Sequence, residues 1–453
     1  METPTTTKNI SPEDLSDLDP RIKPFKISIP DSHLSALHQK LEHASFPDEL
    51  LSHDKSQEWD MGAPLEDIKR LTTYWREGLD WRKAERELNE TLPQYVTAVS
   101  VEGFGDDVEV HFVYQRARRT VEKGGEGRAI PLLFLHGWPG SFIEVKKVLP
   151  LLTRGDEDQP TFDVVAPSLP NFGFSGGISK KGFGLAQYAE SMHALMTRLG
   201  YAEYIIQGGD WGSFIARAMA LRYPQQSKAI HLNFIPTPPP YPWRNPILFF
   251  QAILGYMIPP FSSSNRRKIA TLQSYLGREN AYAKQQDTYP QTLGYALNDS
   301  PVGLLAWVYD KLHRWTDGYA WTDEEILEWV SIYVFSKAGP AASLRIYHES
   351  VTRPATAASG RDGLGYTWLS RDEVVSTRIA DCVKIAVANF PGEIIQIPGT
   401  WLRAIGNIVR ETEFKKGGHF AAWEAPEVLV NDLKAFMGRS GEAYGAVTNR
   451  DGF

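Results

Sequence analysis

Short apolar segments recur at regular intervals through the middle of the chain, and this pattern limits the possible folds more than any other feature. Four of them are PLLFLHG (131–137), FDVVAPSLP (162–170), EYIIQGGD (203–210) and KAIHLNFIP (228–236). The stretches between them are long enough for helices. Strands that alternate with helices in this way form a parallel sheet with helices on both faces. The sequence therefore predicts an α/β fold with a mostly parallel sheet.

The strand pattern stops after residue 235 and later resumes. Residues 236–353 are rich in Tyr, Trp and Leu at mostly helical spacing, and strands are again predicted in VKIAVANF (383–390) and VRETEFKKGGHF (409–420). An insertion between parallel strands usually lies over their carboxyl ends, where ligands bind. We therefore expect a helical lid over residues 236–353, inserted into a core formed by residues 126–235 and 354–453.

Two further parts precede this core, as expected for a chain of 453 residues. Residues 1–20 are polar and acidic and lack an apolar secretion signal, so we expect a flexible tail and a soluble, cytoplasmic protein. Residues 21–125 form an N-terminal region. Helical spacing follows Pro30 and Pro64, and alternating residues predict a β-hairpin that turns near Gly103–Asp107.

Composition excludes several classes of function. The net charge of -7 argues against a nucleic-acid-binding surface. With Cys382 as its one cysteine, the chain forms no internal disulfide. No metal-ligand spacing is present, and we expect neither a metal nor an organic cofactor. The apolar stretch Pro246–Phe261 is shorter than a membrane span and carries Gln251. We interpret it as a buried helix or lid segment and expect no membrane contact.

The sequence Gly208-Gly209-Asp210-Trp211-Gly212 lies directly between a predicted strand and a predicted helix. This is the form of a nucleophile elbow, a strand-to-helix turn so tight that small residues must flank the central one. The central residue is usually Ser, but here it is Asp210. Ser213 lies three residues further on, inside the predicted helix, and is a poor alternative nucleophile. A capping or buried structural Asp is the other interpretation of Asp210.

The chemistry of a carboxylate at this position limits the substrate. A serine that attacks a saturated carbon would leave an ether, which water does not hydrolyse. A carboxylate that attacks a saturated carbon leaves an ester, and its carbonyl, which belongs to the enzyme, can be attacked by water. Asp210 therefore predicts displacement at a saturated carbon, in an epoxide or in an alkyl halide.

Hydrolysis of such an ester needs a base and a group that orients it. His419 lies in Lys416-Gly417-Gly418-His419-Phe420, just after the last predicted strand, and follows the nucleophile in chain order. Glu393 follows the carboxyl end of strand 383–390 and is predicted to orient His419. Asp381 precedes that strand and lies at the wrong end of the sheet. Asp372 is a more distant substitute.

An oxyanion hole is predicted at His136-Gly137-Trp138-Pro139-Gly140, which follows the strand PLLFL. The backbone amides of Trp138 and Trp211 would donate to the tetrahedral intermediate. A simple Gly/Pro turn is the alternative. We interpret His136 as a structural histidine rather than a second base.

These motifs occur together with others that identify a family. They include HGWPGS, PSLPNFGFSG, GGDWGS, TLGYALNDSPVGLLAWVYDK and GGHFAAWEAPE, and in the N-terminal region PFKISIPDSHLSALHQKLEHASFPD and WDMGAPLEDIKRLTTYWREGLDWRKAERELN. From Arg21 to about Arg439 the chain resembles the microsomal-type epoxide hydrolases, including soluble fungal members and the insect juvenile-hormone hydrolases. The resemblance implies the α/β-hydrolase fold and hydrolysis of a small apolar epoxide with water. In that family Asn171 is usually Gly, and we expect this change to affect only a loop.

The resemblance also implies roles for individual residues. Asp210, Glu393 and His419 match the nucleophile, the acid and the base. Two lid tyrosines act in the family as acids toward the epoxide oxygen, and they match Tyr282 and Tyr347.

From the residues alone, a lid tyrosine is more often part of the core. Tyr289 is a nearby alternative to Tyr282, because Tyr289-Pro290-Gln291 stands where Lys-Pro-Asp is common in the family.

Two other functions remain open from the sequence. A haloalkane dehalogenase shares the elbow Asp, and Trp211 would also suit halide binding; the lid tyrosines argue against it, because a departing halide needs no proton. A non-catalytic ligand receptor could retain the same scaffold. A homodimer is a further possibility. Aromatic lid residues suggest a sizeable apolar epoxide, although many of them could be core: Trp243, Phe249, Phe250, Trp307 and Trp315.

Overall fold

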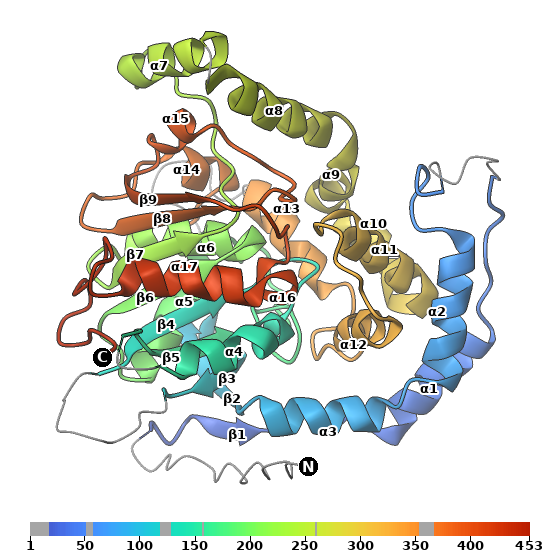
Figure 1. Cartoon of the computed structure of the whole chain (residues 1–453). Helices are drawn as coiled ribbons and strands as arrows, with labels where there is room; N and C mark the ends of the chain where they lie inside the picture. Colours follow the sequence, from blue (N-terminus) through green and yellow to red (C-terminus); the bar gives the residue numbers. More distant parts are fainter. Residues whose placement is uncertain (1–17, 51–57, 118–127, 156–157, 259–260, 353–366) are drawn as a thin grey trace, which may run out of the picture.

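The computed structural model describes residues 18–50, 58–117, 128–155, 158–258, 261–352 and 367–453. Across these ranges nine strands form one sheet, in the order β1-β2-β3-β5-β4-β6-β7-β8-β9 (Figure 1). The strands are β1 (Lys23–Phe25), β2 (Gln94–Val101), β3 (Gly105–Gln115), β4 (Ile130–Leu135), β5 (Phe162–Pro167), β6 (Tyr204–Gly208), β7 (Ser227–Leu232), β8 (Lys384–Asn389) and β9 (Asn407–Glu413).

The sheet is parallel from β5 to β9 and antiparallel at its other edge. The parallel pairs run in the order β5-β4-β6-β7-β8-β9, and the antiparallel pairs in the order β1-β2-β3-β5. Strand β5 therefore pairs in parallel with β4 and antiparallel with β3. Every residue of β4 and β5 is buried, as expected for strands covered on both faces. The prediction of a mostly parallel sheet is confirmed.

Helices cover both faces of the sheet. On one face α4, α16 and α17 pack together, and on the other α5 packs against α6, which also contacts α14 (Figure 1). The core helices are α4 (Val145–Thr153), α5 (Leu185–Arg198), α6 (Asp210–Arg222), α14 (Arg371–Ser376), α15 (Gly399–Leu402), α16 (Ala421–Glu424) and α17 (Pro426–Met437). The core lies around the parallel strands, whose carboxyl ends remain available for a site.

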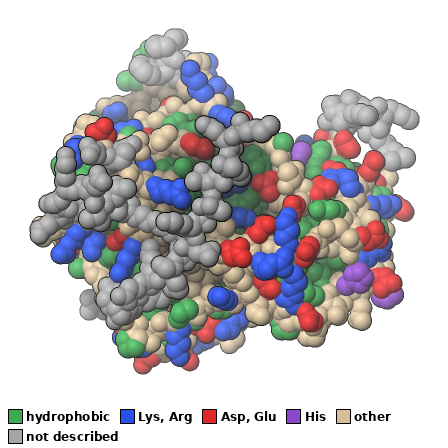
Figure 2. Space-filling view, turned by 60° about the horizontal axis from the view of Figure 1, so that its bottom comes forward, with side chains coloured by type: hydrophobic (Ala, Val, Ile, Leu, Met, Phe, Trp, Pro, Cys, Tyr) green, Lys and Arg blue, Asp and Glu red, His purple; other side chains and the backbone are tan. Residues whose placement is uncertain are grey.

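The N-terminal region extends the sheet and reaches the inserted helices. Its elements are β1, α1 (Asp31–Glu42), α2 (Leu65–Glu77), α3 (Trp81–Thr91) and the hairpin β2–β3. The predicted hairpin and the two predicted helices are confirmed. Helix α3 was not predicted, although Trp81, Ala84 and Leu88 are buried at helical spacing. On the face shown in Figure 2, acidic and basic side chains lie interspersed.

The segment between β7 and β8 is helical, as predicted for a lid. Its elements are α7 (Pro246–Met257), α8 (Phe261–Ser274), a π-helical turn (Tyr275–Glu279), α9 (Ala281–Thr288), α10 (Pro290–Asp299), α11 (Pro301–Arg314), α12 (Asp323–Val334) and α13 (Arg345–Val351). Helices α1 and α2 pack against α11, and α2 also contacts α12. The Tyr309 hydroxyl donates to Asp67 Oδ2 across this contact, at 3.0 Å. The division of the chain into four parts stays a prediction.

Of the two interpretations of Pro246–Phe261, a buried helix or a lid segment, the structure agrees with the lid segment and not with burial. None of the described residues of α7 is buried, and the helix projects from the end of the molecule (Figure 1). Apolar periodicity reports which side chains share a face, but not whether another element covers that face. Within the described ranges, no helix is both long and apolar enough to cross a membrane.

Candidate active site

Asp210 occupies the strained turn between β6 and α6. Its φ is +46°, in the left-handed region that L-residues other than Gly seldom adopt. Tight packing enforces the turn: a Cβ on Gly212 would lie 2.3 Å from the Leu135 carbonyl oxygen, and one on Gly137 would lie 2.2 Å from Asp210 Oδ1. The small residues of both motifs are therefore required by geometry. They present Asp210 at the carboxyl end of β6 and at the positive end of the α6 dipole.

His419 and Glu393 meet Asp210 in the order that the sequence predicts. His419 Nδ1 lies 2.7 Å from Glu393 Oε1, and His419 Nε2 lies 3.4 Å from Asp210 Oδ2. The two loops are joined by a parallel bridge between Gly392 and Gly418. Both His419 and Glu393 are buried. The imidazole thus lies between two carboxylates.

These carboxylates set the charge of His419. Burial by itself lowers the pKa of the imidazole, but Glu393 and Asp210 outweigh burial and raise this pKa to about 10. On Glu393 burial has the opposite effect: it raises the pKa of the carboxyl, and the positive charge of His419 opposes that rise. The short contact between buried groups favours an imidazolium paired with a carboxylate. The two carboxylates therefore favour the protonated form of His419 in the free site.

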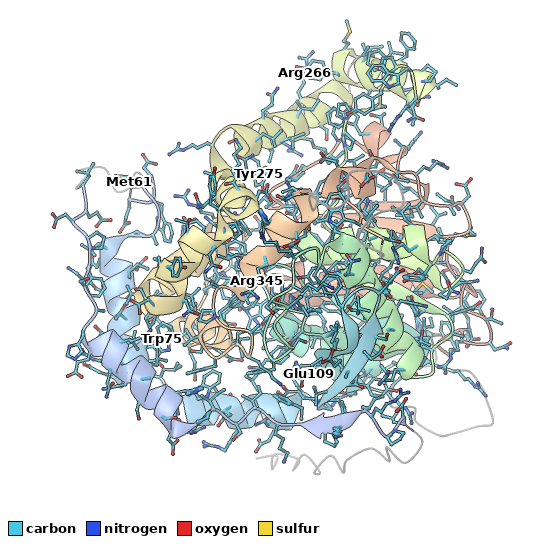
Figure 3. The ribbon with its side chains drawn as sticks, turned by 180° about the vertical axis from the view of Figure 1, so that it is seen from behind. Met61, Trp75, Glu109, Arg266, Tyr275 and Arg345 are labelled. Atoms are coloured by element: carbon cyan, nitrogen blue, oxygen red, sulfur yellow. The ribbon has the colours of Figure 1, made fainter. Side chains whose placement is uncertain are left out.

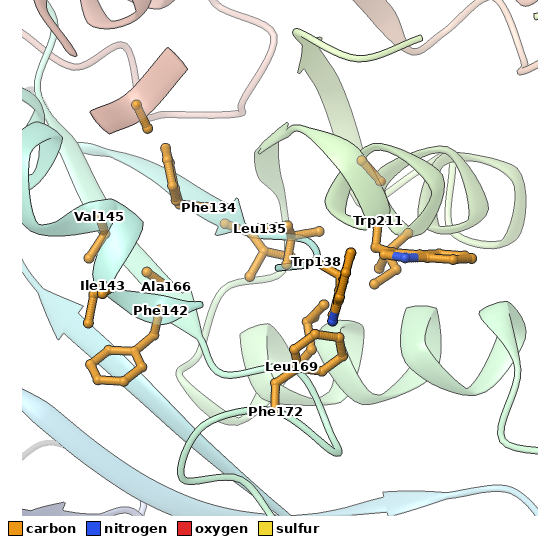
Figure 4. Close-up of a cluster of buried hydrophobic side chains, with 14 of the residues drawn as sticks. Phe134, Leu135, Trp138, Phe142, Ile143, Val145, Ala166, Leu169, Phe172 and Trp211 are labelled. Carbon is orange, nitrogen blue, oxygen red and sulfur yellow. The ribbon is translucent and has the colours of Figure 1, made fainter. Parts of the chain in front are cut away.

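The predicted oxyanion hole lies against the nucleophile. The backbone N–H of Trp138 donates to Asp210 Oδ1 at 2.7 Å. Trp138 and Trp211 belong to the buried cluster shown in Figure 4. The part of the Trp211 amide as a second donor stays a prediction. His136 is buried and joins two loops, because its Nε2 accepts from the Leu169 N–H at 3.1 Å, in keeping with a structural role.

Two tyrosines from the lid enter the same space. Tyr282 and Tyr347 are 6% and 3% exposed, and their ring centres lie 6.1 Å apart. The ring of Tyr282 stacks on Trp138, and that of Tyr347 packs edge-on against Trp211. Burial raises the pKa of both hydroxyls well above the usual value. Both therefore stay protonated and able to donate.

The two weaker alternatives lie outside this arrangement. Tyr289 is 70% exposed, and it does not line the cavity that contains Tyr282. The geometry therefore favours Tyr282 over Tyr289. Asp372 is exposed and lies at the edge of that cavity. Asp381 is exposed and pairs with Arg378 at 2.6 Å.

Two cavities adjoin Asp210. The larger measures about 230 Å³, and its lining includes Asp210, Trp211, Phe214, Phe234, Tyr275, Tyr282, Tyr347, Leu276, Arg371 and Ile395. The smaller measures about 20 Å³ and is bounded by Asp210, His419, Glu144, Gly137 and Trp138, among others. A polar cavity of that size holds about one water molecule. Asp210 lines both cavities and thus lies between the larger, mostly apolar space and the small one.

Sequence reasoning missed three contributors to the site. Glu144 lines the small cavity, where burial raises its pKa to about 8, His419 opposes the rise and Asp210 adds to it. The Tyr275 hydroxyl lies 3.1 Å from that of Tyr282. The Trp315 carbonyl accepts from the His419 N–H at 2.8 Å. Only Glu144 had a signal in the sequence, since it closely follows the HGWPG motif.

No group of His, Cys, Asp or Glu that could hold a metal ion occurs among the residues that the structure describes. The site instead combines a carboxylate, a paired histidine, buried hydroxyl donors and a backbone donor. Such a set can attack a carbon, protonate a leaving oxygen and activate water.

Known proteins share both the sequence and the fold. A family model described as "Epoxide hydrolase N terminus" matches residues 22–145, and one described as "alpha/beta hydrolase fold" matches residues 130–300. Epoxide hydrolase 1 of Sus scrofa is 33% identical, over 93% of this chain and 89% of that protein. Juvenile hormone epoxide hydrolase 1 of Ctenocephalides felis is 31% identical, over 94% and 88% respectively.

A solved structure extends the likeness to three dimensions. The structure of Aspergillus niger epoxide hydrolase is 31% identical and has a TM-score of 0.74, covering 93% of this chain and 97% of that one. The relatives and the structure match almost the whole chain, including the N-terminal region and the lid. The chain therefore belongs to the epoxide hydrolase family of enzymes, built on the α/β-hydrolase fold.

Proposed function

We propose that this enzyme converts a small apolar epoxide into a vicinal diol through an ester on Asp210. The observation that carries the proposal is the convergence of Asp210, His419, Tyr282 and Tyr347 around one buried site. The larger cavity offers mostly aromatic and aliphatic side chains, which suit an apolar substrate. The predicted cytoplasmic location and a homodimer stay predictions.

In the first step an oxygen of Asp210 attacks one ring carbon. Oδ1 already accepts from the Trp138 N–H, so we assign the attack to Oδ2. A carbon–oxygen bond of the epoxide breaks, and the departing oxygen takes a proton from Tyr282 or Tyr347. A buried hydroxyl with a raised pKa releases its proton only to a strong base, which the opening epoxide oxygen becomes. The product is a hydroxyalkyl ester of Asp210.

Formation of the ester removes the negative charge from Asp210, and this converts His419 into a base. One of the two carboxylates that hold the imidazolium proton becomes neutral. The pKa of His419 then falls, and its proton can pass, directly or through water, to the tyrosinate left by the first step. The neutral imidazole accepts a proton from water. The first chemical step thus prepares the catalyst for the second.

In the second step water attacks the ester carbonyl. We place this water in the small cavity between Glu144 and His419. Its proton goes to His419 Nε2, while Glu393 stabilises the imidazolium through Nδ1. The charge that develops on Oδ1 is stabilised by the Trp138 N–H. Collapse of the intermediate expels the diol alkoxide, which takes the proton from His419, and leaves Asp210 as the carboxylic acid. The acid then passes its proton to His419, and this restores both the Asp210 carboxylate and the imidazolium.

The tyrosines distinguish this proposal from dehalogenation. A halide leaves without a proton, and two buried hydroxyls at the nucleophile would serve no purpose in its departure. The alternative receptor function is less well supported, because His419 and the Trp138 N–H both lie against Asp210 and Glu393 pairs with His419.

A single-turnover experiment in ¹⁸O-labelled water tests the ester directly. With enzyme in excess over styrene oxide, the first diol takes its new oxygen from Asp210 and carries no label, whereas multiple turnovers give labelled diol. Asp210→Ala forms no diol, and His419→Gln accumulates a protein heavier by the mass of the epoxide. Labelled diol in the first turnover would exclude the ester. Halide release without diol formation would favour dehalogenation.

A further inference from the structure

Helix α7 exposes a continuous apolar stripe. Ile247, Phe250, Leu254 and Ile258 repeat at helical spacing on one face, with Met257 beside them, and Trp243 precedes the helix. We call these six residues the α7 patch. They are between 51% and 75% exposed: Trp243 75%, Ile247 72%, Phe250 63%, Leu254 52%, Met257 63% and Ile258 51%. A contiguous patch of large apolar side chains on a surface marks an interaction site.

The charged side chains of the segment that carries the patch are all positive. The sequence has no Asp or Glu between residues 230 and 278, although the whole chain has a net charge of -7. Arg244, Arg266 and Arg267 are exposed. The guanidinium of Arg266 lies 5.2 Å from the ring of Tyr256 and donates to the Tyr256 carbonyl. This part of the lid is therefore apolar and cationic within an otherwise acidic protein.

We propose that the α7 patch docks on an anionic lipid surface. A helix with apolar residues on one side and arginines beside them binds in the interface of a bilayer rather than across it. Trp243 and Tyr256 have the amphipathic rings that favour the headgroup level. Each arginine near an anionic leaflet strengthens binding about fivefold. The patch thus matches such a surface in both hydrophobicity and charge.

A second copy of the chain matches this surface less well. A twofold interface brings the same patch of both copies together. Such an interface would gather Arg244, Arg266 and Arg267 of both copies, and the segment has no acidic residue to pair with them. A lipid headgroup layer supplies the missing negative charges.

The position of the patch relative to the larger cavity supports lipid docking. Helix α8 connects α7 to Tyr275 and Leu276, which line that cavity, and Leu276 is 51% exposed. Figure 3 shows Arg266 at the outer end of this arm and Tyr275 at its inner end. Docking through α7 therefore places the lipid at the outer end of α8, and this 14-residue helix leads from it to the cavity. If the proposed function holds, apolar epoxides that leave the bilayer would reach Asp210 along this arm.

Vesicle binding by the full chain, without substrate, tests the inference independently of catalysis. We would sediment the protein with phosphatidylcholine vesicles that contain either no phosphatidylserine or about 30% of it. The wild type is expected to bind the anionic vesicles, and Phe250→Glu/Leu254→Glu to bind at least tenfold less. Arg266→Ala/Arg267→Ala should lose about 25-fold, from about fivefold per arginine. Tyr295→Glu, which changes another exposed aromatic residue of the lid, should bind like the wild type.

Two results would overturn the inference. One is the absence of binding to anionic vesicles, and the other is equal binding by Phe250→Glu/Leu254→Glu and the wild type. If the wild type does not bind vesicles but sediments as a dimer, and this double variant sediments as a monomer, the patch joins two copies of the chain. Circular dichroism and diol formation from a water-soluble epoxide establish that each variant is folded, because none of these residues contacts the site.

Discussion

The charge of Asp210 keeps His419 protonated in the free enzyme, and its removal should change the pKa of His419. Asp210→Asn removes the charge but keeps the shape, and its side-chain oxygen can still accept from the Trp138 N–H. The variant therefore resembles the neutral ester electrostatically. We expect the pKa of His419 to fall from about 10 toward the ordinary value of a histidine.

The size of this shift follows from the structure. His419 Nε2 and Asp210 Oδ2 lie 3.4 Å apart. Two unit charges at that distance interact with about 5 kcal/mol at an effective dielectric constant of about 20, which corresponds to about 3.6 pKa units. Rearrangement around the neutral Asn reduces this change in the pKa of His419 toward the change of roughly one to three that a single neighbouring charge produces. A fall of about 2–3 units is therefore expected.

Carbon-13 NMR of histidine-labelled enzyme measures the titration, and the His419→Gln variant identifies the resonance. Asp372→Asn is the matched control, because it removes a carboxylate from the edge of the larger cavity. That control should leave the midpoint of His419 unchanged. If His419 titrates at the same pH in Asp210→Asn and in the wild type, the proposed change from proton donor to base is refuted.

Three further predictions follow from the same geometry. Tyr282→Phe and Tyr347→Phe should each lower kcat/KM for epoxides about 10- to 100-fold, because each removes one donor to the leaving oxygen. The double variant should form no ester in stopped-flow or mass measurements. If the double variant still forms the ester at the wild-type rate, the two tyrosines are not the acids. Glu393→Gln should slow ester hydrolysis by at least about 100-fold while ester formation persists, so that mass spectrometry finds the ester accumulated; equal slowing of both steps would contradict a role in activating water. The carboxyl of Glu144, whose pKa is raised to about 8, favours the folded state fully below the unfolded pKa of about 4.3, and this contribution is lost as the pH rises to about 8. The free energy of unfolding of Glu144→Gln should therefore rise by about 1–3 kcal/mol relative to that of the wild type between pH 5 and 9, measured by urea unfolding. A difference that stays constant over this range would contradict the raised pKa.

The elbow was predictable because local packing dictates it. Gly212 and Gly137 leave room for atoms that would otherwise clash, and such constraints appear directly in the sequence. The approach of Glu393 to His419 followed from strand order alone, since parallel strands present their carboxyl ends at one edge. These inferences needed no knowledge of how distant side chains pack.

The remaining contacts depend on tertiary packing and have no local signature. The Tyr275–Tyr282 hydroxyl pair spans the π-helical turn between α8 and α9, and no spacing rule predicts that turn. Helix α7 shows the opposite case. Its periodicity is that of a buried helix, yet α8 and α15 contact it without fully burying any of its described residues. Whether a face is covered is a property of the whole fold.

The lid and the catalytic loop share hydrogen bonds, and this limits how the enzyme can open. The His419 N–H donates to the Trp315 carbonyl, and the Gly417 N–H donates to Asp317 Oδ2. The Asp317 N–H in turn donates to Glu424, just beyond the catalytic loop. A lid that swung away here would displace His419 from Asp210. We therefore expect residues 315–317 to stay in place throughout the reaction, while the half-exposed Leu276 marks one side on which the larger cavity approaches the surface.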